Sequence, residues 1–249
     1  TDLEQTRGVV NIYKPKVIVH LAAATDLERC KVDRSYANSV NVLGTRNLAI
    51  AASEINAKLV YISTNAVFDG KKFGAYFEDD RPNPQENYGQ SKHLGELEVS
   101  HFLKNYLIVR SSWIFGGGLV RDKKFVAKII GLLKDHKTTE IKAINDRRGT
   151  PTFAKDLVIA LKDLIEQDRR GIVHVANYGC CSRYDVAREI VSFFGAKVKV
   201  TPVSSDYFGL HANQLVNECL GSKFYETRPW QEALYEYLRT EWFQSSTNG

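Results

Sequence analysis

The sequence has no methionine, and none of its apolar stretches is long enough to cross a membrane. The longest, at positions 17–24, includes a histidine and falls far short of the roughly 20 residues that a membrane helix needs. No secretory signal opens the chain either. Because Thr1 or Asp2 already reads as the cap of a helix, the missing methionine predicts that the chain starts in the middle of a domain.

Cysteine is scarce as well. The four cysteines are Cys30, Cys180, Cys181 and Cys219, and their spacing does not match that of a zinc site, so we expect no metal. The adjacent pair Cys180 and Cys181 is too constrained to be a usual structural disulfide. Together these features predict a reducing cytoplasm as the setting of the protein.

The sequence also lacks a concentration of charge of one sign. Its formal net charge is +5, and its lysines and arginines are scattered among acidic residues instead of forming the basic stripe of a nucleic-acid binder. We therefore expect neither a nucleic-acid nor a membrane partner, whereas an anionic small-molecule substrate is compatible with this charge. A hydrophobic share of 43% over 249 residues is typical of a globular protein with a substantial core.

Short apolar runs alternate with segments of helical periodicity along the first half of the chain. Strands are predicted at 16–23, 58–64 and 106–112, and helices at 35–54 and 88–103. The helix at 35–54 should turn four residues inward, namely Val40, Leu43, Leu48 and Ala51. This alternation predicts an α/β protein with a Rossmann-like, doubly wound parallel sheet covered on both faces.

The second half follows a looser order. Helices are predicted at 122–136, 153–167, 182–195 and 228–242, and a strand at 171–177. We interpret residues 1–118 as the remainder of an NAD(P)-binding domain. Residues 119–249 are predicted to be mainly a smaller substrate-binding lobe, with some elements packing back on the sheet.

Polar or small segments follow the three predicted strands of the first half, namely "AAAT", "STNA" and "SSWIFG". Ligands of parallel sheets bind at the carboxyl ends of the strands, so these segments should line one crevice. A tyrosine and a lysine in "ENYGQSK", Tyr88 and Lys92, lie four residues apart on one helix face. With 12 tyrosines and 19 lysines, chance alone gives about one such spacing. The spacing therefore needs support from its surroundings.

Six stretches stand in a recognisable order: "HLAAAT", "NVLGTRNLA", "VYISTNAVFDG", "NYGQSKHLGE", "IVRSSWIFG" and "INDRRGTPT". They resemble the extended short-chain dehydrogenase/reductase superfamily and, within it, the dTDP-4-dehydrorhamnose reductase family. The resemblance covers essentially the whole chain. It implies NADPH- or NADH-dependent reduction of the C4 carbonyl of a dTDP-linked 4-keto-6-deoxy sugar, as in dTDP-L-rhamnose biosynthesis.

The resemblance also implies roles for individual residues. The catalytic residues would be Thr64, which polarises the carbonyl, Tyr88, which donates a proton, and Lys92, which lowers the pKa of Tyr88 and binds the nicotinamide ribose. The cofactor would be bound by Ala22, Ala23, Ala24, Ser63, Tyr88, Lys92 and Ser111. The substrate would be bound by Thr64, Asn65, Trp113, Arg147 and Arg148.

Structural interpretations stand beside several of these roles. Thr64 is alternatively a turn cap, with Ser63 as the reactive hydroxyl in its place, and Trp113 is alternatively a core aromatic. Residues 22–24 fit an apolar strand end equally well, and Arg147 and Arg148 fit a solvated charge pair. His20 and His174 look structural, and Asn41 is expected to tie neighbouring backbone.

Three departures from the family pattern are visible. The glycine-rich turn that holds the cofactor pyrophosphate is missing, so the chain is expected to bind cofactor poorly as given. Asn65 and Ala66 stand where the family has aspartate and tyrosine, and the family's arginine–proline pair is not evident in "GLHANQLVNE" at 209–218. Two alternatives therefore stay open: a non-catalytic subunit resembling the regulatory beta subunit of methionine adenosyltransferase, and another nucleotide-sugar epimerase or dehydratase. A homodimer is a compatible assembly for the chain.

Overall fold

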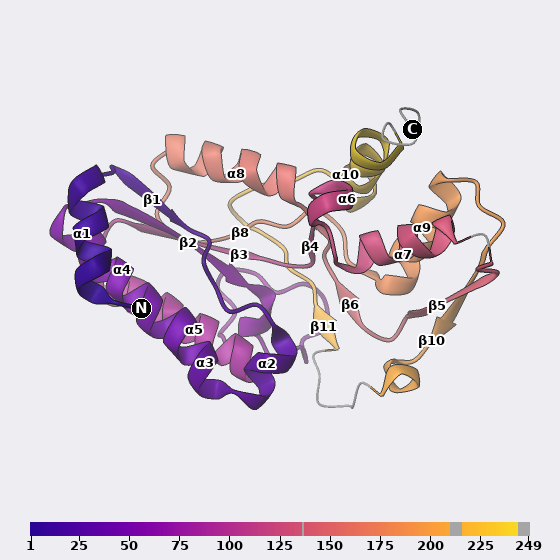
Figure 1. Cartoon of the computed structure of the whole chain (residues 1–249), viewed down its shortest axis with the longest axis horizontal. Helices are drawn as coiled ribbons and strands as arrows, with labels where there is room; N and C mark the ends of the chain where they lie inside the picture. The colour runs from indigo at the N-terminus through magenta and orange to yellow at the C-terminus, as the bar shows by residue number, and fades with distance from the viewer. Residues whose placement is uncertain (136, 210–215, 244–249) are drawn as a thin grey trace. The chain divides into compact units, whose positions relative to one another are not determined.

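A computed structural model describes residues 1–135, 137–209 and 216–243 (Figure 1). The chain divides into two compact units. The first unit comprises Thr1–Asp69, Glu78–Ser111 and Leu164–His174, and the second comprises Gly70–Phe77, Ser112–Asp163 and Val175–Gly249. The functional division at residues 118 and 119 stays a prediction.

The first unit is built on a four-stranded parallel sheet, which confirms the predicted Rossmann-like α/β class. Its strands are β1 (Val17–His20), β2 (Lys58–Thr64), β3 (Tyr106–Ser111) and β8 (Gly171–His174), in the order β1-β2-β3-β8. The register pairs Thr64 with Ser111, so the carboxyl ends of β2 and β3 lie side by side. The late strand β8 joins the same sheet.

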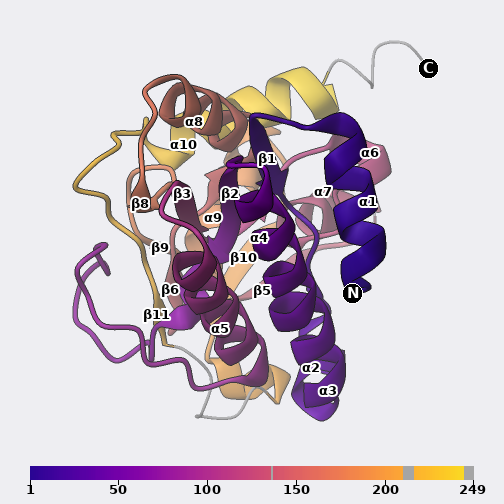
Figure 2. The same cartoon turned by 90° about the vertical axis from the view of Figure 1, so that its left-hand side faces the viewer.

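The helices that lie wholly in the first unit are α1 (Leu3–Tyr13), α2 (Leu27–Val32), α3 (Arg34–Asn38), α4 (Thr45–Glu54) and α5 (Asn87–Phe102). Of these, α4 and α5 pack on the sheet with small apolar side chains. Figure 2 shows α4 and α5 side by side, and their buried residues include Ala49, Ala52 and Val99, which pack on Leu59 and Ile108 of the sheet. As predicted, Asp2 caps α1, accepting a hydrogen bond from the backbone N–H of Gln5 at 3.0 Å.

The predicted helix at 35–54 contains an unpredicted change of helical phase. A π-helical segment, η1 (Ser39–Gly44), separates α3 from α4. Because a π turn holds more residues than an α turn, it rotates the side chains out of the 3.6-residue pattern. Asn41 and Val42 are buried, whereas Leu43 is 44% exposed, so the expectation that Leu43 points inward is wrong.

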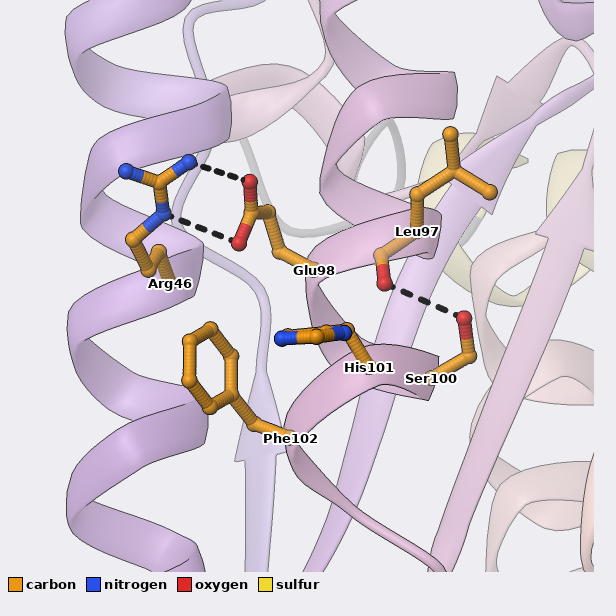
Figure 3. Close-up of a pocket in the computed structure, with 6 residues that line it drawn as sticks. All are labelled: Arg46, Leu97, Glu98, Ser100, His101 and Phe102. Atoms are coloured by element: carbon orange, nitrogen blue, oxygen red, sulfur yellow. Dashed lines mark hydrogen bonds and ion pairs between the residues drawn. The ribbon is translucent and has the colours of Figure 1, made fainter.

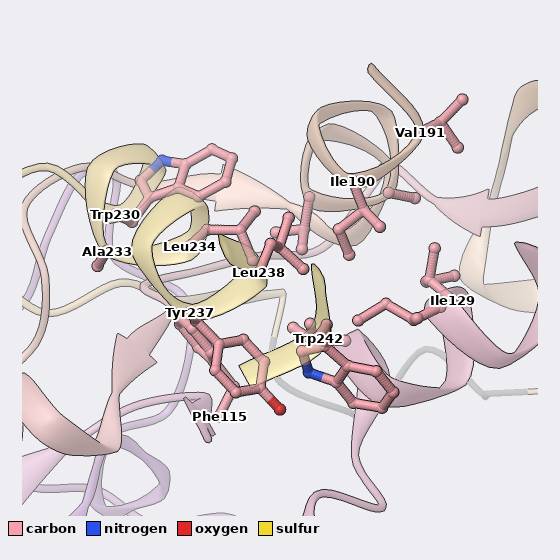
Figure 4. Packing of buried hydrophobic residues seen from close by; sticks show 14 of the residues in the cluster. Phe115, Ile129, Ile190, Val191, Trp230, Ala233, Leu234, Tyr237, Leu238 and Trp242 are labelled. Atoms are coloured by element: carbon pink, nitrogen blue, oxygen red, sulfur yellow. The ribbon is translucent and has the colours of Figure 1, made fainter. Parts of the chain in front are cut away.

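The second unit has its own apolar core (Figure 4). Its helices are α6 (Gly118–Arg121), α7 (Phe125–Lys134), α8 (Ala154–Glu166, whose last three residues belong to the first unit), α9 (Arg183–Phe193) and α10 (Trp230–Tyr237), with a π-helical end η4 (Leu238–Phe243). Ile129, Ile190, Leu234 and Tyr237 meet in this core. Ser182 caps α9 as predicted, in a reciprocal capping box with Asp185.

Several short elements of the second unit were not predicted. They are the parallel pair β5 (Glu140–Ile144) and β10 (Lys199–Val203), the pair β4 (Ile114–Phe115) and β7 (Thr152–Phe153), the three-stranded sheet β11 (Asn217–Glu218), β6 (Arg148–Gly149) and β9 (Cys181–Ser182), and the 3-10 helix η3 (Ser205–Phe208). The first unit adds the 3-10 turn η2 (Asn65–Val67). Two-residue strands carry no periodicity that a sequence can reveal.

The structure pairs Cys180 with Cys219 in a disulfide, with Cα atoms 5.6 Å apart. Cys180 does not bond to its neighbour Cys181, as expected, but its bond to Cys219 was not predicted because the two residues are 39 positions apart. Cys30 and Cys181 are buried free thiols. The reducing cytoplasmic setting stays a prediction.

Two further observations bear on the sequence-based expectations. Residues 210–215, within the segment in which the arginine–proline pair was sought, lie outside the described residues. No helix in the described part of the chain combines the length and apolar character needed to cross a membrane.

Candidate active site

Helix α5 brings Tyr88 and Lys92 to the carboxyl ends of β2 and β3. A glycine allows this approach: a Cβ at Gly89 would collide with the carbonyl oxygen of Ala66 in η2. Contacts of α5 with both β2 and η2 hold its first turns beside the polar end of β2. The helix therefore presents the tyrosine and lysine of "ENYGQSK" to the strand end at which Thr64 lies.

Tyr88 is a partly exposed side chain whose ring packs against the small buried cluster of Ala24, Cys30 and Ala37. Burial raises the pKa of the Tyr88 phenol above its usual value, while the adjacent Thr64 hydroxyl, which favours phenolate, opposes the shift. The net shift of the Tyr88 pKa is upward, and the role of Lys92 in lowering it stays a prediction. A raised pKa keeps the phenol protonated at neutral pH.

Lys92 is buried, and its ammonium points at the sheet. Nζ donates to the carbonyl oxygen of Ile62 at 2.7 Å and lies 4.0 Å from the centre of the Tyr61 ring. Burial lowers the pKa of Lys92 to about 7, and the carboxylate of Glu96 opposes this shift. The lysine donates one N–H to the Ile62 carbonyl, and its other N–H groups have no hydrogen-bond partner among the described residues.

Thr64 ends β2 and is both a cap and a neighbour of Tyr88. Its hydroxyl oxygen accepts from the backbone N–H of Ala66 at 3.2 Å, so the interpretation as a turn cap is confirmed. The same hydroxyl donates to the side-chain oxygen of Asn65 at 3.3 Å and lies close enough to Tyr88 to influence its pKa. Capping fixes the position of the hydroxyl oxygen and leaves its O–H free to rotate, so the two interpretations of Thr64 do not exclude each other.

The three alanines after β1 that were predicted to bind the cofactor differ in their solvent exposure. Ala22 is exposed and Ala23 is partly buried, whereas Ala24 is fully packed. Asn41 holds Ala24 on both sides: its Oδ1 accepts from the Ala24 N–H at 2.8 Å, and its Nδ2 donates to the Ala24 carbonyl at 3.3 Å. Asn41 therefore ties neighbouring backbone, as predicted. Only Ala22 and Ala23 present accessible surface.

A buried ion pair that the sequence analysis missed lies beneath this site. Arg110 in β3 is 1% exposed and binds the carboxylate of Glu96 in α5 through two hydrogen bonds, of 2.8 and 2.7 Å. Ser63, predicted to bind cofactor, donates its hydroxyl to the same carboxylate at 2.6 Å. Burial raises the pKa of Glu96, but the hydrogen bonds from Arg110, His93 and Ser63 and the Arg110 charge together outweigh it, and the pKa falls to about 2. The sequence signal for this buried ion pair was the arginine, Arg110, inside the apolar run "YLIVRSS".

Ser111 ends β3, next to Thr64 in the register. Its hydroxyl is buried and has no hydrogen-bond partner among the described residues. A buried unpaired hydroxyl is costly, which suggests that a ligand supplies the missing partner. The unused N–H groups of Lys92 and the hydroxyl of Ser111 therefore fit a nicotinamide cofactor with a hydroxylated ribose.

The remaining predicted residues belong to the second unit. Trp113 is partly buried, and its indole Nε1 donates to the Oε2 of Glu218 at 2.8 Å. Arg148 is exposed and donates from Nη2 to the carbonyl of Cys180 at 2.9 Å, and Arg147 is partly buried. The crevice predicted to join Trp113 to the strand ends of the first unit stays a prediction.

A separate hollow in the first unit lies over α4 and α5, away from the strand ends (Figure 3). Arg46 and Glu98 close one side of it with hydrogen bonds of 2.9 and 2.6 Å, and His101 and Phe102 lie below them. Such a bidentate ion pair on a helix surface is adequately explained by helix packing, so we assign no function to this hollow.

Residues 1–242 match the family described as the RmlD substrate binding domain. The chain belongs to that family. It is 32% identical over 243 residues to the spore coat polysaccharide biosynthesis protein SpsK of Bacillus subtilis, covering 96% of this chain and 84% of that protein. It is 34% identical to the dTDP-4-dehydrorhamnose reductase of Mycobacterium tuberculosis, covering 88% and 74%.

Solved structures of the RmlD family agree with this fold. The dTDP-4-dehydrorhamnose reductase of Yersinia enterocolitica has a TM-score of 0.90 and 35% identity, covering 96% of this chain and 87% of that one. The enzyme of Bacillus anthracis in complex with NADP has a TM-score of 0.89 and 34% identity, covering 96% and 85%. The resemblance identified from the sequence motifs is thereby confirmed.

Proposed function

We propose that this chain reduces the C4 carbonyl of a dTDP-linked 4-keto-6-deoxy sugar, as a dTDP-4-dehydrorhamnose reductase does. The oxidoreductase class follows from relatives at about one-third identity that are named as such reductases. The observation that carries the proposal is the placement of the Tyr88 phenol beside the Thr64 hydroxyl, with Lys92 one helical turn away. A carbonyl oxygen at this strand end would meet two hydroxyl donors.

The proton chemistry belongs to Tyr88 and Thr64. On substrate binding, the Thr64 hydroxyl would turn its proton from the Asn65 side-chain oxygen to the carbonyl oxygen, so that negative charge developing there is stabilised. Tyr88 would transfer its phenolic proton to the same oxygen as the alcohol forms. The raised pKa of Tyr88 supports this role because the group holds its proton at neutral pH, and an alkoxide is a far stronger base than a phenolate.

A nicotinamide cofactor, when bound, supplies the hydride that the carbonyl carbon accepts. Lys92 would bind ribose hydroxyls through its unused N–H groups, and Ser111 would offer its buried hydroxyl to the same ligand. The NADP in the Bacillus anthracis relative supports this class of cofactor. Glu96 and Arg110 lie behind these residues and keep α5 against the sheet.

Turnover of NADPH by the purified chain, with the family's glycine-rich turn supplied ahead of Thr1, tests the proposal. NADPH should be oxidised when dTDP-4-dehydrorhamnose is present and not when it is omitted. Tyr88→Phe removes one oxygen and the transferable proton, and we expect kcat to fall by roughly 100-fold or more, the scale of general acid catalysis. The change should leave the packing of the ring in its small cluster intact.

Tyr36→Phe is the matched control, since Tyr36 contacts the same cluster but lies on α3. Its turnover should equal that of the parent chain. Full activity in Tyr88→Phe would refute the assignment of Tyr88 as proton donor. Absence of turnover on this sugar, with NADPH still bound, would refute the substrate.

A further inference from the structure

Trp113 is held in an unusual backbone conformation in the second unit. Its φ angle is 40°, in the left-handed region that a bulky residue rarely adopts. Such strain costs on the order of 1–3 kcal/mol and persists where surrounding contacts over-determine it, often at ligand sites. The contacts around the Trp113 indole therefore indicate which arrangement of side chains the strained backbone maintains.

The small sheet β11-β6-β9 forms one side of the indole's environment. The register pairs Glu218 with Gly149, and Gly149 with Cys181, so these three positions lie on one face of the sheet. Gly149 leaves room for the indole, because a Cβ there would collide with the ring of Trp113. Glu218 accepts the indole N–H at 2.8 Å. Arg148 alternates with Gly149, and its side chain therefore leaves from the opposite face.

Arg183, the first residue of α9, lies over two aromatic rings, those of Trp113 and Phe125. Its guanidinium carbon is 4.3 Å from the centre of the Trp113 ring and 5.0 Å from that of Phe125. The side chain is partly buried, yet among the described residues the guanidinium has no hydrogen-bond or ion-pair partner. Glu218 affects Arg183 through space without a hydrogen bond between them.

Partial burial removes water molecules from the Arg183 guanidinium. Its contacts with the aromatic rings compensate for only part of the hydration free energy that is lost. Cation–π contacts contribute about 0.5–2 kcal/mol, whereas the N–H donors at the edge of the group stay unused. The planar fork of these donors matches the oxygens of a phosphate. Contact with the rings of Trp113 and Phe125 also restricts the guanidinium before a ligand arrives, which lowers the entropic cost of binding.

We propose that Arg183 is a substrate-binding residue that donates hydrogen bonds to the diphosphate of the nucleotide sugar. The inference rests on the proposed function for the identity of the ligand, and it adds a residue that the sequence motifs did not single out. Trp113 and Glu218 act as positioning residues for the guanidinium. Arg148 leaves the other face of the small sheet, and its role in substrate binding stays a separate prediction.

Equilibrium binding to the full chain tests the inference without turnover. Affinities for dTDP, thymidine and NADPH are measured by titration calorimetry for the parent, Arg183→Ala, Arg183→Gln and Arg188→Ala. Arg188 is the matched control: it lies on the same helix, is exposed and contacts the Tyr184 ring at 5.7 Å. Loss of a charge-assisted hydrogen bond should weaken dTDP binding by roughly 10- to 100-fold in both Arg183 variants.

Thymidine and NADPH should bind these variants as they bind the parent, and Arg188→Ala should match the parent for all three ligands. Unchanged dTDP affinity in the Arg183 variants overturns the inference, and so does an equal loss of thymidine or NADPH affinity. Arg183→Gln keeps a planar polar group, the side-chain amide, and its dTDP affinity provides the test if Arg183→Ala does not fold. A chain that binds dTDP through Arg183 but does not reduce the keto sugar would contradict the proposed function and leave this inference standing.

Discussion

At the scale of single residues, Lys92 is the charged group of the candidate site that responds most directly to pH. Burial brings its pKa to about 7, so that both charge states are populated under physiological conditions. Its neighbour His20 is also affected: burial lowers the pKa of His20 to about 4, and the Lys92 charge adds to the shift. Lys92 is thus cationic below neutrality, where His20 remains a neutral partner for Thr45 at 3.0 Å.

The lowered pKa of Lys92 predicts how stability changes with pH. An unfolded lysine titrates near 10.4, so between about pH 7 and 10 the unfolded chain binds more protons than the folded chain. The free energy of unfolding should therefore rise with pH across this range, with a Lys92 contribution approaching about 1.4 kcal/mol per pH unit. Urea unfolding at pH 7 and pH 9 measures it.

Lys92→Met should lack this contribution, while Lys104→Met, which removes an exposed lysine, should follow the parent. Comparing the variants cancels groups that titrate in all three chains. An identical rise in Lys92→Met and in the parent would show that Lys92 keeps an ordinary pKa.

At the scale of elements, α5 depends on close approach to its neighbours. Gly89 allows contact with Ala66, and Gly95 allows contact with the Tyr61 hydroxyl and with the carbonyl oxygen of Asn41, which a Cβ would approach to 2.7 Å. Both glycines occur in the "NYGQSKHLGE" motif. The motif therefore specifies the packing of the helix as well as its chemistry.

Gly95→Ala tests this packing. The added methyl group would overlap backbone and a buried ring, so we expect a loss of about 1–3 kcal/mol in the free energy of unfolding. Gly8→Ala is the control within a helix, because no atom lies within 4 Å of the added Cβ. It should gain about 0.5–1 kcal/mol from helix propensity. Thermal unfolding of both variants and the parent measures these changes in stability. Equal stabilities of the two variants would contradict the packing argument.

Burial explains which elements the sequence could predict. All of β2 except Ile62 is buried, and its continuous apolar run predicted the strand with correct ends. Strand β5 alternates exposed and buried residues, a readable strand pattern that was missed, whereas β6 has only two residues and shows no period. The spacing of Tyr88 and Lys92 was readable, whereas the pairing of Glu96 with Arg110 depends on how α5 lies on the sheet. Arg183 was not identified because its role depends on Trp113, 70 positions earlier.

At the scale of the whole molecule, the two units differ in their spectroscopic groups and covalent links. All three tryptophans, Trp113, Trp230 and Trp242, belong to the second unit. The Cys180–Cys219 disulfide belongs to it as well, and it joins the loop before β9 to the residue after β11. Tryptophan fluorescence therefore follows the unit that contains the disulfide, while circular dichroism follows both units.

Reduction should weaken the second unit selectively. The bond closes a loop of 39 positions, for which the chain-entropy model gives a stabilisation of about 4 kcal/mol. With dithiothreitol, the urea midpoint followed by tryptophan fluorescence should fall, and Cys180→Ser should show the same fall without reductant. Cys30→Ala, which removes a free thiol of the first unit, should keep the response to reductant. A midpoint that responds to neither treatment would mean that the two thiols are not bonded in solution.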